Sequence, residues 1–172
     1  MRCSICIATY RRPKLLKKLL ISLSNQQVPG NWEKEIVIVD NDAYETARPV
    51  FKQFANNSQN IKYFVQPVKN ISLTRNEAVK NAGGDYLVFI DDDEHADPNW
   101  LKNLIETIEN YKADVVIGRI FSNIRPIRRN GLNPHSFSTV LHLLQGKSHF
   151  LLIPEIALSN AALLKNFKDL LI

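Results

Sequence analysis

Short apolar segments of strand length alternate with segments of helical periodicity along most of this chain. The run Ile36 to Val39 is apolar throughout, which is typical of a strand in a sheet covered on both faces. Expected strands cover 2–8, 36–39, 61–65, 86–90 and 115–120, with helices from Pro13, within 45–56, over 72–82 and from Asp97-Pro98. The alternation predicts an α/β domain with a mainly parallel, doubly wound sheet and right-handed crossovers.

Length and composition fit one folded domain. The chain has 172 residues, of which 45% are hydrophobic and 23% charged, enough for one core and short for two. The net charge of +5 suits an anionic partner, which could be nucleic acid, a nucleoside diphosphate or an acidic membrane face. Basic and aromatic residues are not interleaved on one face, so we expect no nucleic-acid partner.

Cys3 and Cys6 fall within the first expected strand, where residues three apart point to opposite faces. We therefore expect buried thiols rather than a redox or zinc pair. Met1 leads directly into that strand, without a secretory leader pattern. No segment approaches the roughly 18 apolar residues that a membrane span needs. These features predict a cytoplasmic protein with peripheral membrane contact at most.

Four consecutive acids, Asp91 to Glu94, directly follow the expected strand over 86–90. Carboxylates packed so closely repel one another, and a divalent cation such as Mg²⁺ or Mn²⁺ relieves the repulsion because it prefers hard oxygen ligands. Ligands of doubly wound sheets bind at the carboxyl ends of the strands, where this run lies. The alternative is a solvated acidic turn that only caps the next helix.

Two further segments place polar residues at the same edge. Asp40 ends the expected second strand, where an acid can accept a hydrogen bond from a base or ribose, although Asp is also an ordinary turn residue. Asn70 or Ser72 can cap the helix that carries Arg75. A cation near a helix start is disfavoured by the helix dipole, so Arg75 indicates a bound diphosphate or, alternatively, a plain surface arginine.

Together these segments resemble the family 2 glycosyltransferases, which have the GT-A fold. The resemblance covers residues 3 to 110 and rests on segments in the family's order and spacing. The Asp-Asp-Asp-Glu form is similar to the branch that extends bacterial exopolysaccharide or lipid-linked oligosaccharide chains. The segments are Ala8-Thr9-Tyr10-Arg11-Arg12-Pro13, Ile38 to Asn41, Asn70-Ile71-Ser72 with Arg75-Asn76, Gly84-Asp85, Asp91 to Glu94, and Pro98 to Leu101.

The resemblance implies an inverting transfer of a sugar from a nucleoside diphosphate donor, usually a UDP-sugar, to a hydroxyl of a glycan or lipid-linked acceptor. It also implies a divalent cation, Mg²⁺ or Mn²⁺, at the family's D-x-D motif. Carried over by position, the donor-binding residues are Ala8, Thr9, Arg11, Asp40 toward the base, Arg75 toward the diphosphate, Asp91 and Asp92. The implied metal ligands are Asp93 and Asp91.

The general base that the family supplies after the D-x-D motif has no convincing counterpart in this chain, so no catalytic base is assigned. We expect a GT-A fold incomplete at its carboxyl-terminal end, with a donor-binding region over 1–122 and, in the same domain, a basic loop and the start of the acceptor side over 123–172. A short helix over 136–145 and strand-like segments over 151–153 and 156–164 are expected there. The rival functions are a catalytically silent nucleotide-sugar-binding fragment and another metal-dependent nucleotide enzyme.

Overall fold

A computed structural model of the chain describes residues 1–56 and 60–117 and the backbone of 162–165. These residues form a six-stranded sheet with the strand order β3-β2-β1-β4-β6-β5. The strands are β1 (Arg2–Thr9), β2 (Glu33–Asp40), β3 (Ile61–Val65), β4 (Tyr86–Phe89), β5 (Val115–Ile117) and β6 (Ala162–Lys165). The helices are α1 (Pro13–Ser24), α2 (Arg48–Ala55), α3 (Ile71–Asn81) and α4 (Trp100–Tyr111).

Four strands of the sheet are parallel. β1 lies at the centre and pairs in parallel with β2 on one side and β4 on the other, while β3 extends the sheet beyond β2. β6 is antiparallel to both β4 and β5 and lies between them. The predicted α/β fold with a mainly parallel sheet is therefore confirmed, with one antiparallel strand inserted near its edge.

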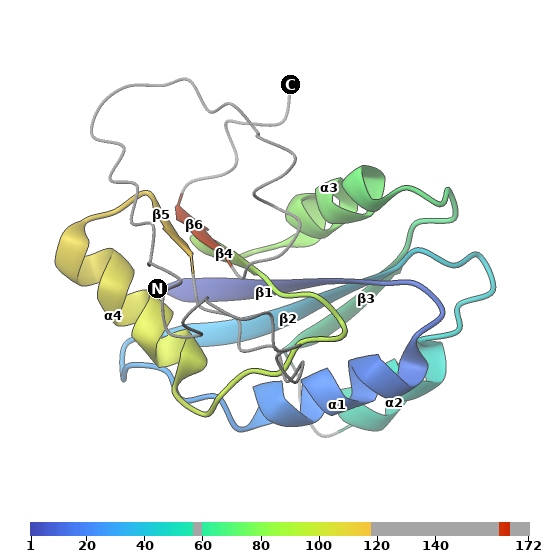
Figure 1. Ribbon diagram of the computed structural model, residues 1–172, viewed down its shortest axis with the longest axis horizontal. Helices are drawn as coiled ribbons and strands as arrows, with labels where there is room; N and C mark the ends of the chain where they lie inside the picture. The colour runs from blue at the N-terminus through green and yellow to red at the C-terminus, as the bar shows by residue number, and fades with distance from the viewer. Residues whose placement is uncertain (57–59, 118–161, 166–172) are drawn as a thin grey trace, which may run out of the picture.

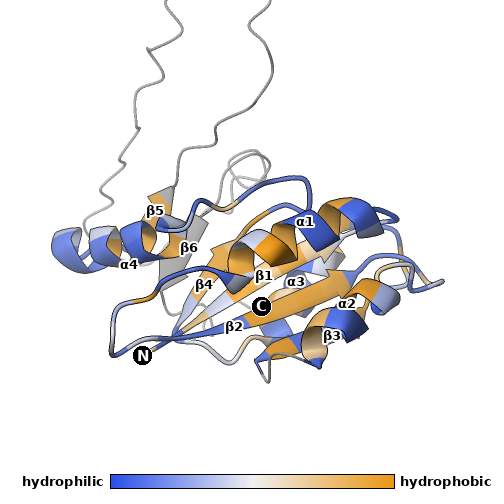
Figure 2. Ribbon diagram, turned by 90° about the horizontal axis from the view of Figure 1, so that it is seen from below, coloured by the Kyte–Doolittle hydropathy of each residue, from blue (hydrophilic) through white to orange (hydrophobic). Residues whose placement is uncertain are grey.

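Helices cover both faces of the sheet, as the predicted doubly wound arrangement requires. In Figure 1, α3 lies on one side of the sheet and α1 and α2 on the other. The larger core joins buried side chains of α1 and α4 to one face, and the smaller core packs Ala78 of α3 against the opposite face. Figure 2 shows the apolar strands between helices that turn polar residues outward.

The two cysteines lie on opposite faces of β1, as the spacing predicts. Cys3 belongs to the larger core and Cys6 to the smaller one, and both are free thiols. Burial raises the pKa of Cys6 to about 12, so this thiol stays protonated at neutral pH and packs as an apolar group.

The predicted start of the fourth helix is wrong. The helix begins at Trp100, and its N-cap, Asn99, makes no side-chain capping bond. The carbonyl of Asp97 instead accepts the N–H of Trp100 in a turn. The cap comes from Gln26, whose Oε1 accepts the N–H of Leu101 at 3.0 Å while its Nε2 donates to the carbonyl of Asp97 at 2.6 Å.

Of the expectations for residues after 122, only the strand near 156–164 is described in part, as β6. The expected helix over 136–145, the strand-like segment over 151–153 and the basic loop lie outside the described residues. Within the described ranges, no helix combines the length and apolar character needed to cross a membrane.

Candidate functional site

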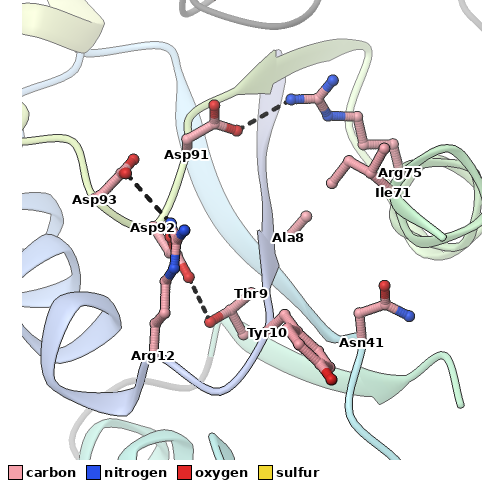
Figure 3. Close-up of a pocket in the computed structure, with 10 residues that line it drawn as sticks. All are labelled: Ala8, Thr9, Tyr10, Arg12, Asn41, Ile71, Arg75, Asp91, Asp92 and Asp93. Atoms are coloured by element: carbon pink, nitrogen blue, oxygen red, sulfur yellow. Dashed lines mark hydrogen bonds and ion pairs between the residues drawn. The ribbon is translucent and has the colours of Figure 1, made fainter. Parts of the chain in front are cut away.

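A pocket opens where β1, β2 and β4 end and α3 begins. Its volume is about 270 Å³, and Figure 3 shows its lining side chains. The lining residues are Ala8, Thr9, Tyr10, Arg12, Asn41, Ile71, Arg75, Asp91, Asp92 and Asp93. The pocket lies at the carboxyl edge of the parallel strands, where doubly wound sheets bind their ligands.

The first three acids of the run all line the pocket, each in a different setting. Asp91 is partly exposed, and its Oδ1 lies 3.1 Å from Nη2 of Arg75. Asp92 is buried and accepts a hydrogen bond of 2.8 Å from Oγ1 of Thr9. Asp93 is the most open of the three, with 54% of its side chain exposed. The run thus combines an anchored acid with two that a ligand can reach.

Arg12 bridges two of these acids. Its Nη1 lies 3.2 Å from Oδ1 of Asp92 and 3.3 Å from Oδ2 of Asp93. In Figure 3 the guanidinium of Arg12 lies beside both carboxylates, and that of Arg75 faces Asp91. Two arginines from different elements, the start of α1 and the first turns of α3, therefore balance the acids.

Two acids of the run, Asp92 and Glu94, have raised pKa values. Burial raises the pKa of Asp92, even though hydrogen bonds from Thr9 and Arg12 act in the opposite direction. Burial, joined by the charges of Asp91 and Asp93, raises the pKa of Glu94 to about 7, against a backbone hydrogen bond from Asp91. A cation added to this run would favour the charged forms.

The donor set fits a divalent cation that a substrate helps to hold. Among residues 1–56 and 60–117, no group of three or more His, Cys, Asp or Glu side chains could hold a metal ion by itself. Mg²⁺ is commonly bound by one or two carboxylates together with substrate phosphates, rather than by a cage of protein ligands. Asp91 and Asp93 supply hard oxygen atoms on the pocket wall, and the arginine beside each of them shows that a positive charge is accommodated there.

The opposite end of the pocket is aromatic, and two basic side chains lie against the ring that lines it. Tyr10 lines it, and Nζ of Lys69 lies 4.8 Å from the centre of the tyrosine ring. Cζ of Arg11 lies 5.2 Å from the same ring and 5.7 Å from that of Tyr44, which is 81% exposed. In the view of Figure 3, Tyr10 and Asn41 lie away from the three aspartates, so the pocket has two chemically distinct ends.

Asn41 holds two loops of the pocket together. Its Nδ2 donates to the carbonyls of Gln66 at 2.7 Å and Val68 at 2.6 Å, and its Oδ1 accepts the N–H of Asn70 at 3.0 Å. Asn70 in turn caps α3 by accepting the N–H groups of Ser72 and Leu73. One side chain after β2 thereby fixes the start of the helix that carries Arg75.

Comparison with known proteins adds to this geometry. The family model described as "Glycosyl transferase family 2" matches residues 4–170. This chain belongs to glycosyl transferase family 2.

One curated relative is similar in sequence, and two solved structures are similar in fold. The "Succinoglycan biosynthesis protein ExoM" of Rhizobium meliloti is 33% identical over 138 residues, which is 80% of this chain and 44% of ExoM. S. aureus TarS 1–349, solved in complex with UDP-GlcNAc, is 26% identical with a TM-score of 0.64, over 75% of this chain and 37% of the TarS chain. The mannosyltransferase PcManGT from Pyrobaculum calidifontis, solved with GDP-Man and Mn²⁺, shares the fold at 18% identity, with a TM-score of 0.59 over 66% of this chain and 34% of that one. The chain thus spans less than half of each of these relatives.

The structure brings most of the predicted family 2 site residues together. Six of the eight lie in one pocket, and Arg11 and Asp40 do not line it. The predicted contacts of all eight with a donor or a metal stay predictions. The six in the pocket are Ala8, Thr9, Arg75, Asp91, Asp92 and Asp93.

The two predicted site residues that do not line the pocket, Arg11 and Asp40, are paired with other side chains or backbone groups of the protein. Nε of Arg11 lies 3.2 Å from Oδ2 of Asp42. Asp40 is fully buried, and its Oδ2 accepts the N–H of Ala47 and the hydroxyl of Tyr63, each at 2.8 Å. Both residues therefore shape the loop after β2 in this structure.

Four lining residues were not among the predicted site residues: Tyr10, Arg12, Asn41 and Ile71. Tyr10, Arg12 and Asn41 each adjoin a predicted residue in sequence, and Ile71 precedes Arg75 by four positions on α3, which places both on one helix face. The sequence signal for Arg12 is its position beside Arg11, and the signal for Ile71 is its helical spacing from Arg75.

Proposed function

We propose that this chain carries the donor site of a glycosyltransferase that transfers a sugar, with inversion, from a UDP-sugar to an acceptor hydroxyl. The observation that carries the proposal is the pocket itself. In Figure 3, Arg75 and the partly exposed Asp91 and Asp93 lie toward one end, and Tyr10 lies toward the other. This division matches a ligand with a diphosphate at one end and a flat base at the other.

The diphosphate end is built from Arg75, Asp91 and Asp93. The side chain of Arg75 is only 17% exposed, so its charge is weakly screened by solvent, and its planar donors match phosphate oxygens. Asp91 and Asp93 would hold a divalent cation, which supplies stabilisation of the negative charge that builds on the leaving diphosphate. Thr9 and Arg12 keep Asp92 in place behind them.

The nucleoside end is built around Tyr10. A base stacks on an aromatic face, with a contribution of about 1–3 kcal/mol in nucleic-acid complexes. Ala8, Thr9 and Asn41 line the pocket close to Tyr10 along the chain or across the sheet. Asp40 and Arg11 lie directly behind this wall and would act by shaping it, or reach the base after a movement of the loop after β2.

ExoM is named for succinoglycan biosynthesis, and we propose a glycan or lipid-linked acceptor of a bacterial polysaccharide for this chain as well. The donor region would occupy residues 1–122 and the acceptor side would begin within 123–172. A general base for the acceptor hydroxyl is not assigned.

Calorimetric titration tests the donor site. We expect UDP to bind the full chain more tightly with Mn²⁺ than without it, and Asp93→Ala to remove the Mn²⁺-dependent part of the affinity. Glu106→Ala serves as the control, because that acid lies on α4, pairs only with Lys102 among the described residues and is away from the pocket.

The absence of UDP binding in a folded sample would overturn the proposal. Binding without measurable sugar transfer would instead favour the nucleotide-sugar-binding fragment over the enzyme. Transfer to an acceptor with retention of the anomeric configuration, measured by proton NMR of the product, would contradict the inverting reaction.

A further inference from the structure

Arg12 occupies an unusual position for a cation. It is the residue before α1, whose first residue is Pro13, and the amino end of a helix carries partial positive charge that disfavours a neighbouring guanidinium. Its side chain nevertheless turns toward the acids after β4, more than 75 residues further along the chain. The acids, rather than the local helix, therefore determine where this guanidinium lies.

The two ion pairs of Arg12 differ in how firmly they are held. Asp92 has only 6% of its side chain exposed and is fixed by Thr9, whereas Asp93 is 54% exposed and Arg12 itself is 53% exposed. An ion pair between two half-exposed groups contributes little stability, commonly below about 1 kcal/mol. The contact with Asp93 can therefore break at small cost while the contact with Asp92 remains.

The same nitrogen, Nη1, makes both contacts. An arginine has five N–H donors in a planar fork, and no hydrogen bond from Nε or Nη2 of Arg12 to another side chain is found in the part of the chain that the structure describes. Because Arg12 lines the pocket, those donors are available to a phosphate oxygen there.

We propose that Arg12 is the resident counter-ion of the acidic run and gives up Asp93 when a divalent cation and the donor diphosphate enter together. The proposal rests on the donor and metal site described under Proposed function. Without a nucleotide, a cation must compete with Arg12 for Asp93. With a diphosphate bound, the released guanidinium gains a new anionic partner. Cation binding is thereby coupled to donor binding.

The coupling can be measured with Mn²⁺, whose free concentration is followed by electron paramagnetic resonance. The full chain is titrated with Mn²⁺ alone and with Mn²⁺ in the presence of saturating UDP. Arg12→Met removes the charge and keeps a long side chain, and Arg12→Lys keeps the charge. Lys14→Met is the matched control, since it removes one exposed positive charge nearby that forms no ion pair among the described residues.

We expect Arg12→Met to bind Mn²⁺ on the order of tenfold more tightly than the unchanged protein when no nucleotide is present, because a competing charge beside Asp93 is removed. UDP should then improve Mn²⁺ affinity less than it does in the unchanged protein. Arg12→Lys should stay closer to the unchanged protein, and Lys14→Met should match it within about twofold.

Nucleotide-free Mn²⁺ affinity that is unchanged or weaker in a folded Arg12→Met protein would overturn the proposal, and so would an equal gain in Lys14→Met. If Arg12→Met does not fold, Arg12→Lys decides instead. Because the charge is retained, UDP should raise the Mn²⁺ affinity of Arg12→Lys as it does in the unchanged protein, and the loss of that effect would overturn the proposal. Failure of the donor site gives a different pattern, in which UDP does not bind any variant while the Mn²⁺-only difference persists.

Discussion

At the edge of the sheet opposite the pocket, the buried side chain of Glu35 joins three neighbouring segments. Glu35 of β2 has 5% of its side chain exposed, and Nζ of Lys62 lies 3.0 Å from its Oε2. Its Oε1 accepts the hydroxyl of Ser4 and the N–H of Gly83, each at 2.6 Å. A charged residue inside a strand is therefore satisfied by three neighbouring segments, which is the condition for burying it.

Glu35 should make stability depend on pH. Burial acts to raise its pKa, but the hydrogen bonds from Ser4, Gly83 and Lys62 outweigh burial and lower the pKa below the usual 4.5. A carboxyl with a depressed folded pKa stabilises the protein above its unfolded pKa, and that contribution is lost as the pH falls through the folded pKa. We expect Glu35→Gln to lower the free energy of unfolding by about 1–3 kcal/mol at pH 7, and the difference to shrink below pH 4.5.

Urea unfolding from pH 7 to pH 3 measures this difference. Glu33→Gln is the control, because Glu33 lies on the same strand but is 65% exposed in its pair with Arg2. It should change stability by well under 1 kcal/mol. A Glu35→Gln effect that is equal at all pH values would contradict the assigned role of the charge.

Gly84 is required for the close approach of the turn before β4 to β1. A Cβ at this position would lie 2.6 Å from Oγ of Ser4, 2.8 Å from its backbone nitrogen and 2.9 Å from the carbonyl oxygen of Arg2. We expect Gly84→Ala to cost about 1–3 kcal/mol of stability, measured by urea unfolding. At Gly83 the nearest atom would be 3.4 Å away, so Gly83→Ala should be clearly milder, and equal losses in the two variants would refute this steric account.

At the scale of elements, the pocket depends on how loops after different strands are joined. Asn41 after β2 holds the loop after β3 through three hydrogen bonds, and Asn70 of that loop caps α3. The position of Arg75 is thus set by contacts that begin on another strand. Loops placed in this way on a rigid sheet are the usual carriers of binding residues.

Asn41→Ala should therefore weaken both stability and donor binding. Three polar groups of the backbone lose their partner, which costs about 1–3 kcal/mol, and the start of α3 becomes free to shift. We expect UDP affinity to fall several-fold in samples that are fully folded by circular dichroism. Asn99→Ala is the control because the N-cap of α4 makes no side-chain capping bond, and an Asn41→Ala protein with unchanged UDP affinity would show that the loop keeps its position without Asn41.

For the whole molecule, the sequence predicted the elements better than it predicted the directions of side chains. The apolar runs and helical spacings located β1 to β4 and α1 to α3 within a few residues, because buried faces impose a clear period. The start of α4 and the place of β6 could not be predicted, since each depends on a partner distant in the chain: Gln26 for α4, and β4 with β5 for β6.

The same limit applies to the two adjacent arginines of the site: Arg11 was the predicted site residue, but Arg12 lines the pocket. Arg11 has a φ of 55°, a left-handed conformation that is uncommon for residues other than glycine. In this turn Arg11 reaches Asp42, and Arg12 reaches Asp92 and Asp93. Nothing in the sequence distinguishes one arginine from the other, whereas the acidic run and Arg75 were evident from their positions at a strand end and a helix start.

We propose that the pocket at the carboxyl edge of the sheet binds a nucleoside diphosphate together with a divalent cation. A crystal structure of the full chain grown with UDP and Mn²⁺ is the decisive test, and the anomalous scattering of manganese would locate the ion. We predict the ion at Asp91 and Asp93, the diphosphate beside Arg75 and the base on Tyr10. Ordered UDP at another surface, or manganese away from both aspartates, would show that this pocket is not the donor site.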